Sequence, residues 1–190
     1  LGPDYIGMKP TMMVEVGDEV KIGSILFEDK KNPGVFFTSP AGGLIKSINR
    51  GEKRRFISIE IEIADQENQV EIFNDDNEIL LRNLSKYGLI NNFRTRPFNK
   101  TPKPNDIPDD IFVNICDTNP LSVDPYTYLQ HEIDLFNRSL IKLKEIFNCD
   151  IHVCYQNNDF NNFVDGINYY NFNGPHPAGL SGTHLSLIHI

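Results

Sequence analysis

The stretch Ile111-Phe-Val-Asn-Ile-Cys-Asp-Thr-Asn-Pro120 sets the architecture of the second half of this 190-residue chain. Its first six residues form a short apolar run, which is typical of a strand buried on both faces of a parallel sheet. The last four residues break the run with a turn that ends in proline. We therefore expect a strand over residues 111–116 that is followed directly by a corner.

A long amphipathic helix is predicted after this corner. Six apolar residues step alternately by four and three positions, as on the buried face of a helix: Leu129, Ile133, Phe136, Leu140, Leu143 and Phe147. The helix is expected to begin near Asp124-Pro125, because proline is favoured in a first turn.

Two further apolar runs follow the helix. Residues 151–155 predict a second buried strand, and residues 167–172 predict a third. A strand, a helix and a strand in this order form a βαβ unit with a parallel sheet. Residues 185–190 alternate between apolar and polar types, so we expect a last strand there, cut short in a fragment of a longer protein.

The first 73 residues have a different pattern, with short apolar runs broken by turns. Gly17 and Gly23 mark two turns, and Asn32-Pro33-Gly34 marks a hairpin tip. Isoleucines at every second position from Ile57 to Ile63 predict a half-buried strand with one solvent-exposed face. These features predict a small all-β domain.

Residues 74–109 join the two patterns. Asp75-Asp76-Asn77 offers caps for a helix that stops at Gly88, and residues 93–108 contain four prolines, as in a linker or surface arm. We expect a two-domain α+β chain: an all-β barrel-sandwich domain over residues 1–73, the helix and proline-rich linker over 74–109, and a truncated Rossmann-like α/β domain over 110–190.

The amino-acid composition indicates which classes of partner and compartment to expect. The chain carries 18 Lys and Arg against 26 Asp and Glu, a net charge of −8, so nucleic acid is not an expected partner. No window approaches the roughly 18 apolar residues of a membrane span. Cys116, Cys149 and Cys154 show no metal or disulfide spacing, and they predict reduced, buried thiols in a cytosolic compartment.

Two stretches of the first domain are Val16-Gly-Asp-x-Val-x-x-Gly23 and Ser39-Pro-Ala-Gly42. Their turns resemble those of biotinyl and lipoyl carrier domains. Such domains carry a prosthetic group on a lysine at a tight hairpin tip, where Lys30 and Lys31 stand here. The tip is lengthened by the residues that follow it, and no methionine flanks the lysines. We expect the barrel-sandwich fold with two solvated lysines, and keep a carrier domain fused to an α/β module as the alternative.

The corner after the first α/β strand bears on cofactor binding. A dinucleotide pyrophosphate needs glycines there, so that backbone N–H groups can approach it. Residues 117–121 contain no glycine, Pro120 has no N–H, and Asp117 repels phosphate. The residues therefore disfavour NAD or FAD at this corner, and a flavin- or NADH-binding oxidoreductase subunit is kept as a further alternative.

Two other stretches are unusual. Residues 174–184 hold three glycines and two prolines and predict a shaped loop. His176 and His184 lie eight residues apart in it without metal-ligand spacing, so no metal is expected. Arg94-Thr-Arg96 is a basic cluster that suits an anion, a docking partner or a solvated arm. No catalytic constellation is predicted.

Six segments of unusual composition span nearly the whole chain. They are Tyr5-Ile-Gly-Met-Lys-Pro10, Leu26-Phe-Glu-Asp-Lys-Lys-Asn-Pro-Gly-Val35, Ile48-Asn-Arg-Gly-Glu-Lys-Arg54, Arg94-Thr-Arg-Pro-Phe-Asn-Lys100, Asp117-Thr-Asn-Pro-Leu121 and Gly174-Pro-His-Pro-Ala-Gly-Leu-Ser-Gly-Thr-His184. In their order and spacing they resemble one family, the A subunit of the bacterial sodium-translocating NADH:quinone oxidoreductase.

The resemblance implies a peripheral subunit on the cytoplasmic face of the bacterial inner membrane, with the other subunits of a six-subunit complex as partners. That complex reduces ubiquinone with NADH and exports sodium. The resemblance also implies kinship with the flavoprotein subunit of respiratory complex I. In this family other subunits bind NADH, flavin and iron–sulfur clusters, so no cofactor is expected on this fragment, which would support assembly and quinone reduction.

The candidate ligand or partner contacts lie at the strand end and in the shaped loops. They are Arg94, Arg96, Asp117, Thr118, Asn119, His176, Gly179 and His184.

Overall fold

The computed structural model describes residue 5 and residues 7–64, 83–156 and 160–189. The chain forms two compact units, residues 1–106 and residues 107–190. The helix start predicted at residues 75–77 lies outside the described residues. Among the described helices, none has the length and apolar character needed to span a membrane.

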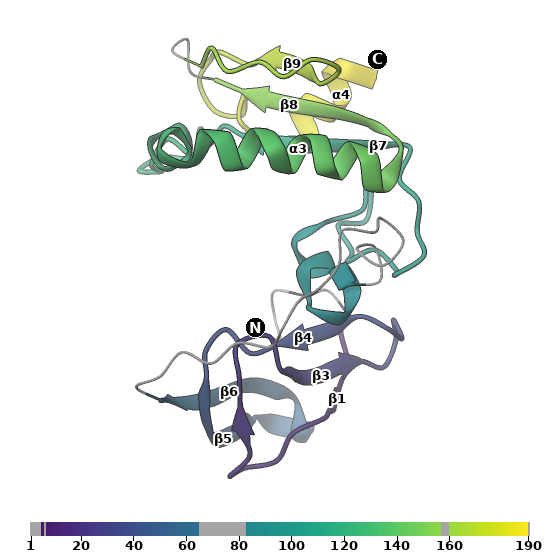
Figure 1. Cartoon of the computed structure of the whole chain (residues 1–190), viewed down its shortest axis with the longest axis vertical. Helices are drawn as coiled ribbons and strands as arrows, with labels where there is room; N and C mark the ends of the chain where they lie inside the picture. The colour runs from purple at the N-terminus through teal and green to yellow at the C-terminus, as the bar shows by residue number, and fades with distance from the viewer. Residues whose placement is uncertain (1–4, 6, 65–82, 157–159, 190) are drawn as a thin grey trace. The chain divides into compact units, whose positions relative to one another are not determined.

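The first unit is built from two antiparallel three-stranded sheets (Figure 1). One sheet has the order β1 (Pro10–Met12), β3 (Ile25–Asp29), β4 (Phe36–Thr38). The other has the order β2 (Glu19–Val20), β5 (Gly43–Arg50), β6 (Phe56–Ile63). The predicted hairpin between residues 25 and 38 is present as the β3–β4 pair.

Aromatic side chains form the centre of this unit. Phe27 stacks on Phe37 with ring centroids 4.6 Å apart, and Tyr5 meets Phe37 edge-on at 4.7 Å. Both sheets contribute to the buried cluster: Val20, Leu26, Phe27, Val35, Phe37, Ile45 and Phe56, which Ile90 joins. The unit is therefore a β sandwich with one apolar core.

The predicted strand over residues 57–63 is present as β6, but its alternation is interrupted. Arg50 pairs with Phe56 while Asn49 pairs with Ser58, so Ile57 is an extra residue in a β-bulge. The bulge turns Phe56 into the core and leaves Ile57 49% exposed. The face prediction was right for residues 59 and 61, which pack on the core, and wrong for Ile57 and for Ile63, which is 70% exposed.

The segment from residue 83 to residue 104 packs on the β strands of the same unit. Residues 83–86 are helical, and Gly88 follows with a φ of +73° before a 3₁₀ helix, η3 (Leu89–Asn92). The amide of Asn91 donates to the carbonyl of Phe36 at 2.7 Å, and the amide of Asn32 donates to that of Pro102 at 3.2 Å. The proline-rich stretch is thus fastened to the hairpin rather than extended away from it.

The second unit contains a parallel sheet in the order β7 (Asp110–Ile115), β8 (Asp150–Tyr155), β9 (Asn168–Asn171). All three strands match the predicted apolar runs. The central strand β8 is buried on both faces, with the successive side chains of Val153 and Cys154 fully covered. The expectation that the first strand is also buried on both faces was wrong, because Ile111 and Ile115 are buried on one face of β7 while Asn114 on the other face is exposed.

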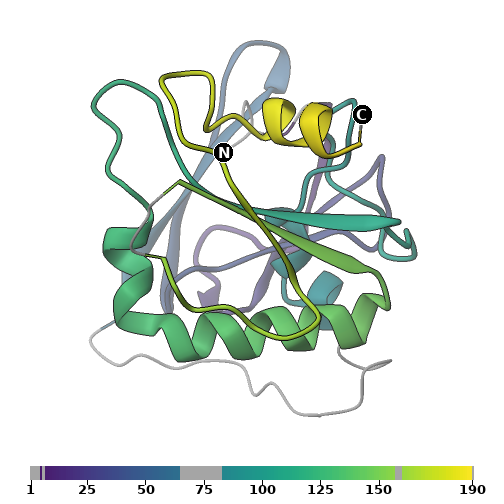
Figure 2. The same cartoon turned by 90° about the horizontal axis from the view of Figure 1, so that it is seen from above.

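The predicted long helix is present in three consecutive pieces, α2 (Tyr126–Leu129), η4 (Gln130–Glu132) and α3 (Ile133–Phe147). Every one of its six predicted inward positions is buried or half-buried. Asn148 ends the helix in the left-handed conformation, with φ +49°. Figure 2 shows α3 on one side of the strands and α4 (Ser181–His189) on the other.

The strand predicted over residues 185–190 was wrong, because residues 181–189 form helix α4. His184, Leu185 and Ile188 are buried or half-buried, while Leu187 is 66% exposed. This one-sided burial follows the period of a helix. The alternation of apolar and polar types over residues 185–190 spans too few residues to distinguish a helix from a strand. The shaped loop therefore ends at residue 180 instead of 184.

Candidate functional site

A candidate site lies at the carboxyl end of β7, where the chain turns through Asp117 and Asn119. One oxygen of the Asp117 carboxylate accepts hydrogen bonds from the backbone N–H of Asn119 at 2.9 Å and from its side-chain amide at 2.7 Å. The side chain of Ser122 and these Asn119 donors lower the pKa of Asp117 below its usual range. The corner therefore carries a fixed negative charge at neutral pH.

The loop before α4 folds back onto this corner. The amide of Asn114 donates to the carbonyl of Gly179 at 3.0 Å, and the N–H of Gly179 donates to the hydroxyl of Thr118 at 2.9 Å. That hydroxyl also lies 3.3 Å from Nδ1 of His176. A Cβ atom at Gly179 would lie 2.6 Å from the backbone nitrogen of Thr118, so only glycine allows this approach.

A buried cysteine and histidine lie beneath the loop. The Nε2 atom of His184 is 2.7 Å from the carbonyl oxygen of Ala178 and 3.4 Å from Sγ of Cys116. A carbonyl can only accept, so Nε2 carries the proton and cannot take one from the thiol. Burial raises the pKa of Cys116 to about 11, and burial lowers that of His184.

The thiol has a different partner. Sγ of Cys116 lies 3.0 Å from the side-chain oxygen of Asn114, which also accepts the backbone N–H of Cys116 at 3.0 Å. A cysteine that is protonated and bonded in this way is not an activated nucleophile. The group of Asn114, Cys116 and His184 is a polar lock that joins β7 to α4.

A shallow cavity of about 310 Å³ opens above this lock. It is lined by Asn114, Cys116, Asp117, Asn119, Pro125, Gly179, Leu180 and Ser181. Its lining offers amide, hydroxyl and carboxylate groups for a small polar ligand. Within residues 5, 7–64, 83–156 and 160–189, no three His, Cys, Asp or Glu side chains gather as a metal site would require.

A dinucleotide pyrophosphate does not fit this corner. The N–H of Asn119 is already bonded to the Asp117 carboxylate, and Gly179 covers the backbone nitrogen of Thr118. Pro120 has no N–H, and the ionised carboxylate would repel phosphate. The residues that would have to hold the phosphates are thus used by the protein's own loop.

The structure brings six of the eight predicted site residues together in the second unit: Asp117, Thr118, Asn119, His176, Gly179 and His184. Sequence reasoning missed Asn114 and Cys116, which connect them. A signal was present, because Asn114 is a polar residue inside an otherwise apolar strand.

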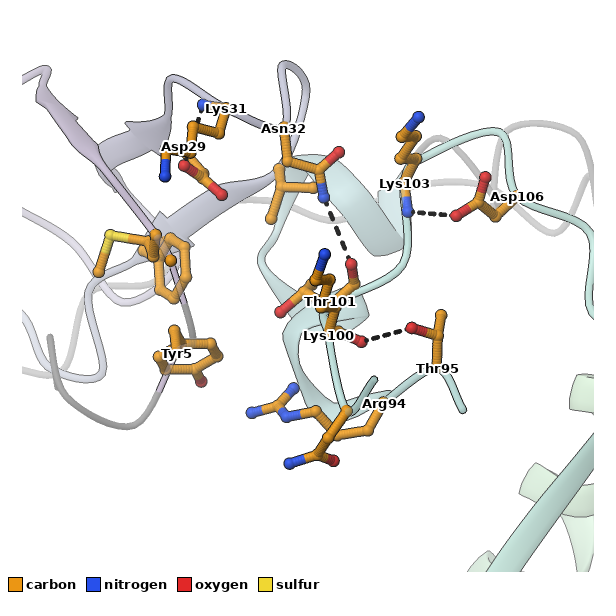
Figure 3. Close-up of a pocket in the computed structure, with 15 residues that line it drawn as sticks. Tyr5, Asp29, Lys31, Asn32, Arg94, Thr95, Lys100, Thr101, Lys103 and Asp106 are labelled. Carbon is orange, nitrogen blue, oxygen red and sulfur yellow. Dashed lines mark hydrogen bonds between the residues drawn. The ribbon is translucent and has the colours of Figure 1, made fainter. Parts of the chain in front are cut away.

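The other two predicted residues, Arg94 and Arg96, belong to the first unit. The guanidinium of Arg94 lies over the ring of Tyr5, 4.7 Å from its centroid, and its Nη1 donates to the carbonyls of Asn91 and Phe93. Arg96 is exposed. Arg94 lines a second and larger cavity of about 580 Å³ in that unit (Figure 3).

These features define a two-domain protein in which a β sandwich precedes a parallel α/β unit whose strand-end corner is filled by its own chain. Comparison with known families gives the same order of domains, with the boundary earlier in the chain than the boundary between the two compact units. Residues 1–64 match the NqrA N-terminal barrel-sandwich hybrid domain, and residues 75–190 match the NqrA second alpha/beta domain. The chain belongs to the NqrA family, the A subunit of the Na(+)-translocating NADH-quinone reductase, which confirms the resemblance and the predicted fold class.

Individual relatives agree with this assignment. The chain is 42% identical to the A subunit of this reductase from Yersinia pseudotuberculosis serotype O:1b (strain IP 31758) and from Histophilus somni (strain 2336), each over 197 residues. It is also 42% identical over 200 residues to that of Actinobacillus pleuropneumoniae serotype 5b (strain L20). Each match covers 99% of this chain and 44% of the relative, so the chain spans less than half the length of these proteins.

Proposed function

We propose that this chain acts as part of the NqrA subunit of a sodium-translocating NADH:quinone reductase, at the cytoplasmic face of the bacterial inner membrane. There it binds other subunits as a peripheral component, supports their assembly and contributes to quinone reduction, and it holds no flavin of its own at the β7 corner. The observation that carries the proposal is the 42% identity across 99% of the chain to relatives of that name.

The geometry of the corner supports the flavin part of the proposal. In a doubly wound sheet the pyrophosphate binds beyond the carboxyl ends of the strands, on free backbone N–H groups. Here Gly179, Thr118 and Asp117 occupy or close that space. The scaffold of a nucleotide-binding unit is thus combined with a corner that is anionic and closed by the protein's own hydrogen bonds.

The test is made in the native host. Deletion of the gene should abolish sodium-stimulated NADH:quinone reductase activity in isolated membranes, and the tagged full-length protein should restore it. The same protein should co-purify with membrane subunits. Restored activity without co-purification, or unchanged activity after deletion, would contradict the proposed role.

Two variants address the corner itself. Asn119→Ala and His176→Ala, made in the assembled complex, should alter assembly or the apparent affinity for quinone. If both remain as in the parent protein, the corner has no part in the function. A visible flavin absorption band in the purified NqrA protein, lost when Gly179 is replaced, would contradict the absence of flavin at this site.

A further inference from the structure

Two basic features of the sequence contribute to one cavity. Lys31 at the β3–β4 hairpin tip and Arg94 in the proline-rich stretch both line the 580 Å³ cavity of the first unit (Figure 3). This volume lies within the range of small-molecule sites. One member of each basic cluster therefore contributes positive charge to this cavity.

The cavity has defined walls. The amide of Asn32 donates to the carbonyl of Pro102 at 3.2 Å, which joins the hairpin tip to the proline-rich stretch. Gly34 has a φ of +87°, and a Cβ atom there would lie 2.9 Å from Cγ of Pro104. The opening is thus shaped by close contacts between segments that are distant in the sequence.

The charges around the cavity are unbalanced. Its lining contains four cationic side chains and two carboxylates, Lys31, Arg94, Lys100 and Lys103 against Asp29 and Asp106. Asp29 accepts the backbone N–H groups of Lys9 at 3.0 Å and Lys31 at 3.1 Å, and Asp106 accepts that of Lys103 at 2.8 Å. Among the described residues, neither carboxylate forms an ion pair with one of these cations. The lining is therefore positive in a chain whose net charge is −8.

Arg94 is held in place as a donor. Its Nη1 donates hydrogen bonds to the carbonyls of Asn91 and Phe93, and its guanidinium carbon lies over the Tyr5 ring. In the described part of the chain, its Nε and Nη2 have no hydrogen-bond acceptor. A planar guanidinium with two adjacent donors suits the oxygens of a phosphate group, and its fixed position lowers the entropic cost of binding.

The rest of the lining suits an organic group. Apolar and aromatic side chains face the same cavity: Tyr5, Met8, Val35 and Phe37. An inorganic ion alone would leave this surface unused, whereas an organic phosphate would cover it. We propose that the cavity between the β3–β4 tip and residues 94–106 binds a small organic phosphate, with its phosphoryl group at Arg94 and with Lys31 adding positive charge to the same lining.

Isothermal titration calorimetry of the full-length protein tests the proposal with AMP, adenosine and inorganic phosphate as probes. We expect AMP to bind, and adenosine to bind at least about tenfold more weakly because it lacks the charged group. Inorganic phosphate should also bind more weakly than AMP. If inorganic phosphate binds as tightly as AMP, the site takes free phosphate, and the apolar lining has no role.

Variants locate the binding. Lys31→Glu should weaken AMP binding by about tenfold or more, because it replaces an attractive charge by a repulsive one. Lys46→Glu, at an exposed position of β5 outside the cavity, makes the same charge change and should leave the affinity as in the parent protein. Arg94→Gln should also weaken binding, with circular dichroism confirming that this variant folds.

The absence of AMP and phosphate binding, or AMP binding that Lys31→Glu does not change, would overturn the inference. The outcome of these binding experiments does not depend on whether the protein acts in the reductase complex. Lys31→Glu should weaken AMP binding while the protein still co-purifies with its membrane partners.

Discussion

The side chains of Cys116 and His184 lie 3.4 Å apart in the second unit, and burial keeps both neutral near pH 7. The proton on Nε2 of His184 is committed to the carbonyl of Ala178, 2.7 Å away. The pair therefore differs from the thiolate–imidazolium pair of a cysteine nucleophile, which needs a free imidazole acceptor. Its neutrality has consequences for stability and for thiol reactivity.

Stability should fall in mild acid because His184 is buried in its neutral form. Burial lowers its folded pKa below 6.5, so the unfolded chain takes up a proton first as the pH falls. The contribution of the neutral His184 to the free energy of unfolding is therefore lost progressively as the pH falls below about 6.5. His184→Gln keeps a donor for Ala178 without titrating, and should show a shallower loss between about pH 7 and pH 5.5.

The pH dependence of the free energy of unfolding can be measured for the second unit alone. The measurement follows hydrogen exchange of the β8 amides by mass spectrometry at increasing urea concentration. His131→Gln removes an exposed histidine and should keep the slope of the parent protein. Equal slopes for His184→Gln and the parent would show that His184 does not titrate differently on folding.

The cysteines should differ in their rates of alkylation. Burial raises the pKa of Cys116 to about 11 and that of Cys154 to about 12, so both are protonated at pH values near 8 in the folded state. Cys149 is half-buried and should react first with iodoacetamide. Peptide mass mapping should show Cys149 labelled and the other two protected until urea is added; rapid labelling of Cys116 in the folded protein would contradict the polar lock.

Gly179→Ala should destabilise the second unit by about 1–3 kcal/mol, because the new methyl group meets the Thr118 backbone and the loop must move. Gly182→Ala is the matched control in the first turn of α4. Its added Cβ finds no atom within 4 Å, and alanine favours the helix by about 0.5–1 kcal/mol. The urea midpoint measured from β8 hydrogen exchange should fall in Gly179→Ala and rise in Gly182→Ala. An unchanged midpoint in Gly179→Ala would show that the loop does not need this contact.

The lysines of the β3–β4 tip should be unmodified. Asp29 and Val35 close the hairpin, with the Asp29 N–H donating to the Val35 carbonyl at 3.0 Å, so five residues form its tip. Asn32 fastens this tip to Pro102. Neither feature suits a tight turn that presents a carrier lysine. The intact mass of the protein from its native host should equal its sequence mass, and a lipoyl or biotinyl increment lost in Lys31→Arg would support a carrier instead.

Local patterns predicted most of the elements. The helix of residues 126–147 was found because its apolar period extends over several helical turns, and the strands β7, β8 and β9 because they coincide with short apolar runs. The pattern failed where an apparent alternation suited a helix as well as a strand, and where a bulge interrupted it. Residues 181–189 were mistaken for a strand, and the bulge at Ile57 changed which isoleucines of β6 face the core.

Three properties could be read from the residues alone: the family, the order of a barrel-sandwich domain before an α/β domain, and the absence of glycine from the corner at residues 117–121. The folded chain was needed to show that Asn114 and Gly179, 65 residues apart, close that corner, and that Lys31 and Arg94 share a cavity. The difference arises because periodicity reports contacts within one element. A site is made by contacts between elements, whose geometry depends on how the whole unit packs.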